Sequence, residues 1–244
     1  MLYDSLIDKF KDDFIEKDRW KWVLEGLRNT LLISMAAVLI GIVIGILIAT
    51  VRTTYDKNGP SIRMKSPVAF FFLRVGNFLA HLYLTVIRGT PVVVQLLIMY
   101  FLVFASASDG VMVAIFAFGI NSGAYVAEIF RSGIMSVDEG QFEAGRAMGL
   151  SYLQTMIYII IPQCFKTVLP TLCNEFIVLL KETSIAGYVG IMDLTKAGDL
   201  IRGRTFDAFL PLIVVALLYL IMVVVLTKLV GRLERRLRKN ERGA

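Results

Sequence analysis

The sequence predicts an all-α integral membrane protein with about five transmembrane helices. Hydrophobic residues make up 57% of its 244 residues, and the mean hydropathy is +0.69. In a typical soluble domain roughly half of the residues are apolar. Several charge-free runs are also close to the roughly 20 residues that a helix needs to cross a bilayer.

Residues 1–26 are expected to form an amphipathic N-terminal segment, in which acidic and basic residues alternate. Phe10 and Phe14 lie on one helical stripe, which predicts a helix on the membrane surface. Acidic residues crowd the start and no apolar core follows them closely, so the segment does not resemble a secretory signal peptide. Trp20 and Trp22 precede the first span, as interfacial aromatic residues do.

Residues 27–230 are expected to form a transmembrane domain. Pro162 and Pro170 interrupt its fourth span, and each removes a backbone donor, so we expect a kink or an unwound turn there. The segment 68–87 is apolar but carries charged and polar side chains, which favours an interfacial or partly embedded helix over a full span. The five predicted spans are residues 31–51, 92–107, 111–130, 152–180 and 209–227.

The charges of the loops predict the orientation of the chain. Residues 52–65 are expected to form a basic loop with a turn at 58–60, and residues 231–244 a heavily basic tail. The positive-inside rule puts both in the cytoplasm and the N-terminus outside, with residues 181–204 as a polar outer loop. The net charge of +6 follows from this pattern. The sequence has no basic patch interleaved with exposed aromatic residues, so it does not indicate nucleic-acid binding.

Small residues recur at every fourth position of the first span, at Ala37, Gly41, Gly45 and Ala49. Such a strip lets two helices approach closely within a membrane. The pattern leaves open whether the partner helix belongs to the same subunit or to another one.

Residues 136–162 form a polar hairpin between two apolar segments. The motifs SVDE and SYLQ, which start at Ser136 and Ser151, have the spacing of capping boxes. Gly149 stands where a helix commonly ends in the left-handed region. The first helix is too short and too polar to be a span. We therefore expect a short rigid helix at 136–150 that docks a partner in water.

Three residues separate Glu143, Ala144 and Gly145 from Gly149, and nine more separate Gly149 from the motif IIIP, which starts at Ile159. This spacing resembles the EAA signature of ABC importer permeases, with Gly145 where the family usually has a second Ala. The flanking segments resemble the polar amino acid branch of that family, of the histidine, glutamine and arginine type. These segments are RGTP from Arg88, AYVAEIFRSGI from Ala124, IIPQ from Ile160 and FIVLLKETSI from Phe176.

The resemblance covers roughly the whole chain after Gly26. It implies the type I importer permease fold in a bacterial cytoplasmic (inner) membrane. It also implies a subunit that imports polar amino acids by alternating access, as a homodimer or as a heterodimer with a sibling permease. A substrate-binding protein outside would deliver the solute. The chain has no P-loop and no G-x-G-x-x-G motif that opens a helix, so ATP hydrolysis is expected in separate ATPase subunits.

The resemblance further implies that residues 143–149 dock into a cleft of the ATPase. Glu143 would offer a carboxylate to the partner. Ala144 and Gly145 would permit a close approach, and Gly149 would set the elbow. The predicted coupling residues are Phe142, Glu143, Ala144, Gly145, Arg146 and Gly149.

An ionisable side chain within a span is costly and is a functional hypothesis by default. Glu175, with Asn174 beside it, is therefore the first candidate for the substrate path, where its carboxylate would bind an ammonium group. Unwound carbonyls near Pro170 would add acceptors. A salt bridge to a neighbouring span is the alternative role of Glu175. The remaining candidates, which the resemblance assigns to the outward gate or its scaffold, are Lys181, Thr183 and Ser184.

No cofactor, metal site or catalytic residue is expected. Neither cysteine has a His or Cys neighbour at metal-binding spacing. The lone His81 has no acidic residue near it in the sequence and G-x-S-x-G is absent, which argues against an intramembrane enzyme. An ABC permease for another small polar solute and an ion-coupled secondary transporter stay open as alternatives, and so does the identity of the amino acid.

Overall fold

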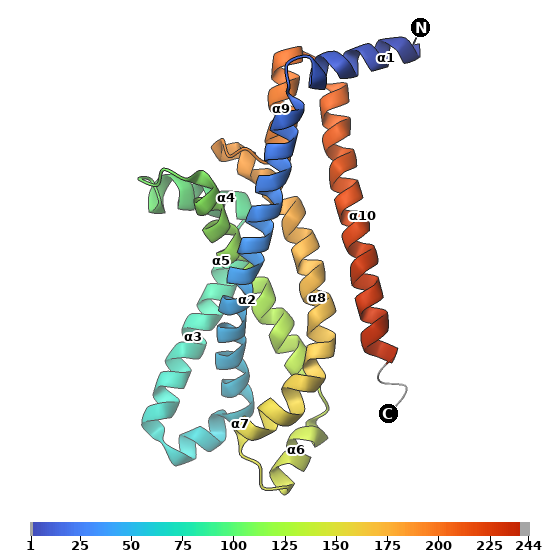
Figure 1. The fold of residues 1–244 in the computed structure, drawn as a ribbon. Coiled ribbons are helices and arrows are strands. Elements are labelled where there is room, and N and C mark those ends of the chain that lie inside the picture. The colour runs from blue at the N-terminus through green and yellow to red at the C-terminus, as the bar shows by residue number, and fades with distance from the viewer. Residues whose placement is uncertain (1, 240–244) are drawn as a thin grey trace. The chain divides into compact units, whose positions relative to one another are not determined.

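The computed structural model describes residues 2–239, which fold into helices joined by short turns (Figure 1). Five helical runs among these residues are long and apolar enough to cross a membrane. This confirms the predicted all-α membrane class and the number of spans. The runs are α2 (Trp20–Lys65), α3 (Pro67–Gly89), α5 (Gly110–Met135), the run Tyr152–Val189, and α10 (Phe209–Lys239).

Shorter elements precede or connect these runs, or form parts of them. α1 (Leu2–Phe10) lies in the predicted amphipathic segment, and α2 begins soon after it. The other short elements are the π-helical turns Lys11–Ile15, Met99–Val103 and Met156–Ile160, α4 (Val92–Ile98), α6 (Glu139–Ala147), α7 (Tyr152–Thr155), α8 (Ile161–Glu182), the 3-10 helix Thr183–Val189 and α9 (Leu194–Thr205).

The second helix long and apolar enough to be a span is α3, so the prediction that 68–87 is an interfacial or partly embedded helix rather than a full span is wrong. α3 contains 23 residues, which is about 35 Å of helix. Its start is fixed by Ser66, whose side chain accepts a hydrogen bond from Ala69 N. Arg74 is exposed on the helix surface, and a long basic side chain can extend its charge toward the membrane interface. Polar side chains therefore do not exclude a span here.

The segment 92–107 was predicted as a span, and this prediction is also wrong. α4 contributes seven residues and the π-helical turn after it five, together about 18 Å of helix. The helix ends at Phe104, whose backbone leaves the helical region (φ −111°, ψ 34°). The segment is apolar enough for a membrane but too short to cross one.

Two segments that were predicted as loops are helical. α2 continues to Lys65 with Pro60 inside it, and the helix bends near its end (Figure 1). A proline removes one backbone donor and kinks a helix without always ending it. The predicted outer loop 181–204 contains a 3-10 helix and α9, which Asp193 caps by accepting from two backbone N–H groups. Polar composition did not reveal these helices because an exposed helix face is polar too.

A kink or an unwound turn was predicted at the prolines of the fourth span, and the helix does not unwind at either of them. The π-helical turn Met156–Ile160 precedes Pro162, and α8 continues through Pro170 to Glu182. One π-helical turn thus lies just before Pro162, and the backbone around Pro170 stays helical.

The chain divides into two compact units, each assembled from segments that are distant in sequence. Unit 1 comprises Met1–Ala37, Val93–Phe118 and Phe176–Leu229. In unit 1, Asn29 Nδ2 donates to the Met192 carbonyl oxygen at 2.8 Å, which joins α2 to the segment before α9. A hydrophobic cluster packs the N-terminal part of the unit against α9 and α10 through Phe14, Val23, Leu194, Ile201 and Val215.

Unit 2 comprises Val38–Val92, Gly119–Glu175 and Val230–Ala244. Within it, α2 and α5 cross closely at the small-residue strip. A Cβ atom at Gly41 would lie 2.9 Å from Ser122 Oγ, and Gly45 faces Val126. The part of the strip in this unit therefore packs against a helix of the same subunit. The sequence had left open whether the partner helix belongs to the same subunit or to another one.

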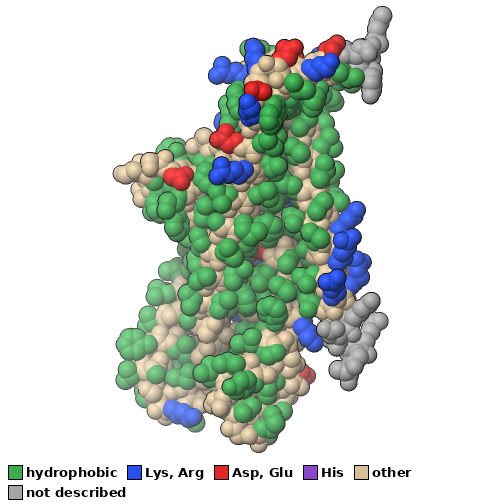
Figure 2. Space-filling view, viewed as in Figure 1, with side chains coloured by type: hydrophobic (Ala, Val, Ile, Leu, Met, Phe, Trp, Pro, Cys, Tyr) green, Lys and Arg blue, Asp and Glu red, His purple; other side chains and the backbone are tan. Residues whose placement is uncertain are grey.

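The surface is suited to a lipid environment. Figure 2 shows hydrophobic side chains over most of the visible face and a row of basic side chains along the last turns of α10. Leu217, Leu220 and Ile221 of α10 are 50%, 57% and 58% exposed. Apolar surface of this extent marks contact with lipid or with protein partners. The basic row contains Lys228, Arg232, Arg235 and Arg236.

Candidate functional site

The predicted docking helix is α6, and Asp138 begins it. Asp138 Oδ1 accepts a hydrogen bond from Gly140 N at 2.7 Å, as an N-cap side chain does. Ser136 instead donates its hydroxyl to the Gly133 carbonyl oxygen at 2.8 Å. The capping box predicted at Ser136 is therefore wrong, because an aspartate two residues later takes the capping position.

The end of α6 is as the sequence predicts. Gly149 has φ +78°, Leu150 N donates to Gly145 O at 3.0 Å, and Gly149 N donates to Arg146 O at 2.9 Å. These two bonds form a Schellman motif, which satisfies the last carbonyls of the helix. The capping box at Ser151 is also confirmed and starts α7. The elbow between α6 and α7 is thus fixed by backbone geometry.

Two of the predicted coupling residues face the interior of unit 2. Phe142 is 4% exposed and packs in a cluster with Met156 and Ile160 of the following helical turn. Gly145 is buried against Thr155, and a Cβ atom there would lie 2.6 Å from Thr155 Cγ2. These residues hold α6 on its own unit.

The other four coupling residues are exposed. α6 therefore has an inner face that anchors it and an outer face that is open to a partner. The exposed residues are Glu143, Ala144, Arg146 and Gly149.

A lysine of α2 holds the first turn of α6. Lys57 Nζ lies 2.6 Å from Glu139 Oε1 and 5.2 Å from the centroid of the Phe142 ring. The hydrogen bond from Lys57 lowers the pKa of the Glu139 carboxyl below its ordinary value, and the charge of Lys57 adds to this effect. Lys57 could not be predicted from the sequence, because its partner Glu139 lies 82 positions away.

Glu175 lines a cavity of about 450 Å³ between α5 and α8, together with Glu128, Tyr125 and Thr171. Ser122 Oγ donates to Glu175 Oε1 at 3.1 Å. Glu128 is paired with Arg131 at 3.3 Å and with Arg88 at 3.7 Å, so the carboxylate of Glu175 is the better candidate to attract a cationic group of a solute. Glu128, which lines the same cavity, was not among the residues that the sequence predicted for the substrate path.

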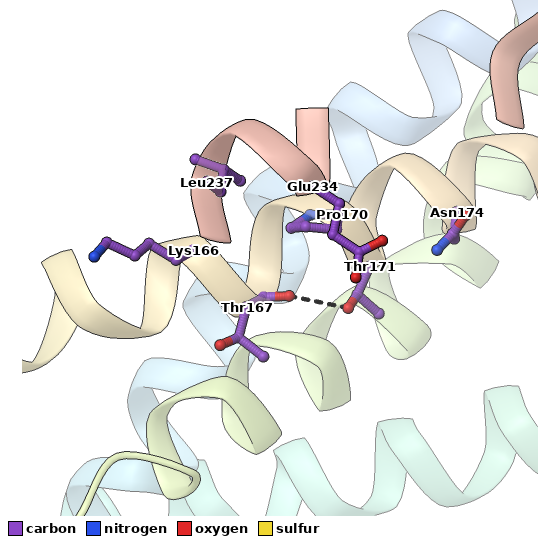
Figure 3. A pocket seen from close by; sticks show the side chains of 7 residues that line it. All are labelled: Lys166, Thr167, Pro170, Thr171, Asn174, Glu234 and Leu237. Atoms are coloured by element: carbon purple, nitrogen blue, oxygen red, sulfur yellow. Dashed lines mark hydrogen bonds between the residues drawn. The ribbon is translucent and has the colours of Figure 1, made fainter. Parts of the chain in front are cut away.

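Asn174 lines a different cavity, of about 300 Å³ (Figure 3). In Figure 3, α8 supplies Lys166 and Pro170, and the end of α10 supplies Glu234. Thr171 lines both cavities, and its hydroxyl donates to the Thr167 carbonyl oxygen at 3.0 Å. Asn174 and Glu175 therefore line two neighbouring cavities rather than one.

The three gate candidates belong to unit 1. Thr183 is fully buried and donates its hydroxyl to the Leu180 carbonyl oxygen at 2.7 Å. Lys181 is exposed, and Ser184 is partly buried in the 3-10 helix. Within residues 2–239, no group of three or more His, Cys, Asp or Glu side chains is arranged to hold a metal ion.

Comparison with known proteins identifies the family. Residues 66–239 match the binding-protein-dependent transport system inner membrane component. The chain belongs to this family. It is accordingly a multi-pass inner membrane component of an ABC transport system and is not itself catalytic.

Three relatives of this family match the chain over most of its length. The putative glutamine transport system permease protein GlnP of Rickettsia bellii is 36% identical over 221 residues, which cover 88% of this chain and 93% of the relative. The arginine transport system permease protein ArtQ of Bacillus subtilis is 34% identical over 223 residues, covering 90% and 94%. The glutamine transport system permease protein GlnP of Escherichia coli is 36% identical over 220 residues, covering 88% and 93%.

Solved structures agree with this family. The crystal structure of an amino acid ABC transporter with histidines has 39% identity and a TM-score of 0.76, and covers 88% of this chain and 94% of that one. An inward-facing MetNI methionine ABC transporter has a TM-score of 0.75 with 92% and 99% coverage, but at 19% identity it shows the fold alone. The importer permease fold implied by the EAA-like spacing is thus confirmed.

Proposed function

We propose that the chain is the membrane-spanning subunit of an ATP-driven importer of polar amino acids. The glutamine and arginine permeases that match nearly its whole length support this substrate class. Separate ATPase subunits would bind and hydrolyse ATP, and a substrate-binding protein outside the membrane would deliver the solute. A second permease subunit, identical or related, would complete the path.

The observation that carries this proposal is the construction of α6. Its inner face is anchored by buried Phe142, and its end is fixed by the Schellman motif at Gly149. Glu143 and Arg146 are left exposed. A helix held this firmly transmits a push from a partner to the helices behind it, whereas a loose loop would absorb it.

The exposed and the buried residues of α6 have different roles in this proposal. Glu143 offers a carboxylate to the ATPase, and Ala144 leaves room for a close approach. Phe142 and Gly145 act from the inner face, by fixing α6 against its own unit. Residues 136–150 thus serve as the coupling helix between the transmembrane domain 27–230 and the ATPase.

The solute path in this proposal includes the cavity lined by Glu175 and Glu128. The ammonium group of an amino acid would approach Glu175, and hydroxyls such as that of Thr171 would face its polar groups. Asn174 would act from the adjacent cavity. The gate or its scaffold would be formed on the outer side by Lys181, Thr183 and Ser184.

The proposed orientation places the N-terminus outside and the C-terminus in the cytoplasm. The basic side chains at the end of α2 and along the end of α10 support it through the positive-inside rule. The coupling helix α6 is then on the cytoplasmic side, where an ATPase can reach it. The basic residues 231–244 would form a cytoplasmic tail.

The test is uptake by proteoliposomes that contain the complete importer. Glu143→Lys should leave membrane insertion intact but uncouple ATP hydrolysis from amino acid uptake. Glu16→Lys makes the same charge change at an exposed residue of the N-terminal segment and serves as the matched control. Normal uptake by Glu143→Lys would refute the docking role of α6.

A further inference from the structure

The end of α2 carries two adjacent charges that reach two different helices of unit 2. Lys57 Nζ lies 2.6 Å from Glu139 Oε1 at the start of α6. Asp56 Oδ2 lies 3.8 Å from Arg131 Nη1 of α5. Because the two residues are neighbours in one helix, α6 and α5 are both attached to the same turn of α2.

Lys57 contacts α6 at two points. Its side chain is 17% exposed, whereas that of Glu139 is 81% exposed. Its ammonium also lies 5.2 Å from the centroid of the Phe142 ring, within the range of a cation–π interaction. One contact is at the surface of α6 and the other is at its buried anchor, so the first turn of α6 cannot shift without changing the surroundings of Lys57.

Through Arg131 and Glu128, Asp56 is connected to the cavity that Glu175 lines. Arg131 Nε donates to Glu128 Oε2 at 3.3 Å, and Glu128 Oε1 lies 3.7 Å from Arg88 Nη1 of α3. Glu128 also lines the cavity of about 450 Å³ that Glu175 lines. An uninterrupted series of ion pairs and one shared helix turn therefore runs from α6 to the wall of this cavity.

We propose that Asp56 and Lys57 are positioning residues that join the coupling helix α6 to the Glu128 wall of the solute cavity. When the ATPase displaces α6, the pair transmits the displacement to α5 and alters the position of Glu128. This inference rests on the proposed coupling role of α6. Neither residue touches the solute, and both act through the charged side chains that they hold.

A stability measurement would not test this idea. The side chains of Asp56, Arg131 and Glu128 are 35%, 30% and 24% exposed, and partly exposed ion pairs contribute little to folding. Spatial proximity is also not evidence of coupling by itself. The test must therefore measure how much solute is transported per ATP hydrolysed, and it must include a double-mutant cycle.

The experiment measures solute transported per ATP hydrolysed in proteoliposomes that contain the complete importer. Lys57→Met keeps the aliphatic stem without the charge, and Asp56→Asn keeps the shape without the charge. Each should lower the transport-to-hydrolysis ratio by about 2- to 30-fold, the range expected for residues in a coupling network. Lys57→Arg should restore most of the ratio. Lys65→Met, at an exposed lysine in the last turn of the same helix, should leave it unchanged.

A double variant separates one connected series from two independent contacts. If Lys57 and Arg131 act in one series, Lys57→Met with Arg131→Met should be no worse than the poorer single variant. Fully additive losses would overturn the proposal, and so would an unchanged ratio in Lys57→Met and Asp56→Asn. The charge swap Lys57→Glu with Glu139→Lys should rescue only in part, because it restores the ion pair but sets a carboxylate against the Phe142 ring.

Glu143→Lys in the same assay distinguishes this inference from the proposed function. If that variant uncouples transport while the Asp56 and Lys57 variants behave like the wild type, only the inference fails. If Glu143→Lys also has no effect, the docking role of α6 fails first.

Discussion

Gly145 of α6 faces Thr155 of α7 so closely that a Cβ atom at residue 145 would lie 2.6 Å from Thr155 Cγ2 and 2.7 Å from Thr155 Oγ1. Thr155 is itself 1% exposed. The absence of a side chain at Gly145 therefore lets α6 and α7 approach this closely.

The first prediction concerns this contact. Gly145→Ala should destabilise the protein by about 1–3 kcal/mol through overpacking, measured as a lower thermal unfolding temperature in detergent. Thr155→Ala should restore most of this loss in the double variant. Within the part of the chain that the structure describes, Thr155 Oγ1 has no hydrogen-bond partner, so its removal breaks no hydrogen bond. A double variant as unstable as Gly145→Ala would contradict the steric explanation.

The second prediction concerns the crossing of α2 and α5. A Cβ atom at Gly45 would lie 2.9 Å from the backbone nitrogen of Ala127, and a helix backbone cannot move aside as a side chain can. Gly45→Ala should therefore cost about 1–3 kcal/mol of stability. Gly231→Ala is the matched control, because no heavy atom lies within 4 Å of the added methyl group. Equal unfolding temperatures for the two variants would rule out close packing at Gly45.

The third prediction concerns Asp193, the fully buried N-cap of α9. Burial raises the pKa of its carboxyl above the ordinary value of 3.8. The folded state therefore binds a proton more tightly than the unfolded state, and the cost of the buried charge is present above the raised pKa. Asp193→Asn keeps a cap acceptor without the charge. Its stability relative to the wild type should be greatest at neutral pH and should decline as the pH falls through the raised pKa.

Asp193→Ala provides the control for the cap itself. It removes the acceptor of the Thr195 and Lys196 backbone N–H groups and should cost about 0.5–2 kcal/mol relative to Asp193→Asn. Thermal unfolding between pH 4 and pH 8, at about one-unit intervals, measures both effects. A wild type and an Asp193→Asn variant that differ by the same amount at every pH would contradict the burial of a charged carboxylate.

The fourth prediction concerns Glu175. Glu175→Gln keeps an oxygen that can accept from Ser122 Oγ but removes the charge. Loss of a charged hydrogen bond to the solute should weaken amino acid uptake about tenfold or more, with ATPase docking unchanged. Uptake kinetics in proteoliposomes measure this, with Glu16→Gln as an exposed control. Unchanged kinetics would remove Glu175 from the solute path.

Local sequence determined several features of this protein. Apolar composition and charge-free runs determined the helical membrane class, because only a helix satisfies its own backbone within a bilayer at these lengths. The end of α6 at Gly149 and the start of α7 at Ser151 could also be predicted from the sequence, since capping depends on residues only a few positions apart. The recurring small residues of α2 predicted a close helix crossing for the same local reason.

Other features depended on contacts between distant residues. The charged and polar side chains of residues 68–87 argued against a span, although α3 is long and apolar enough to be one. The sequence also did not reveal that α2 continues past Pro60, because composition does not define where a helix ends. It placed Phe142 on the coupling face, whereas the packing of α6 against Met156 and Ile160 turns this ring inward. Lys57 and Glu139 meet across 82 positions, and only the folded chain brings such charges together. The helical membrane class and the turn at Gly149 between α6 and α7 thus follow from residues that are close in sequence. The way α6 packs against the rest of unit 2 follows from contacts between distant residues.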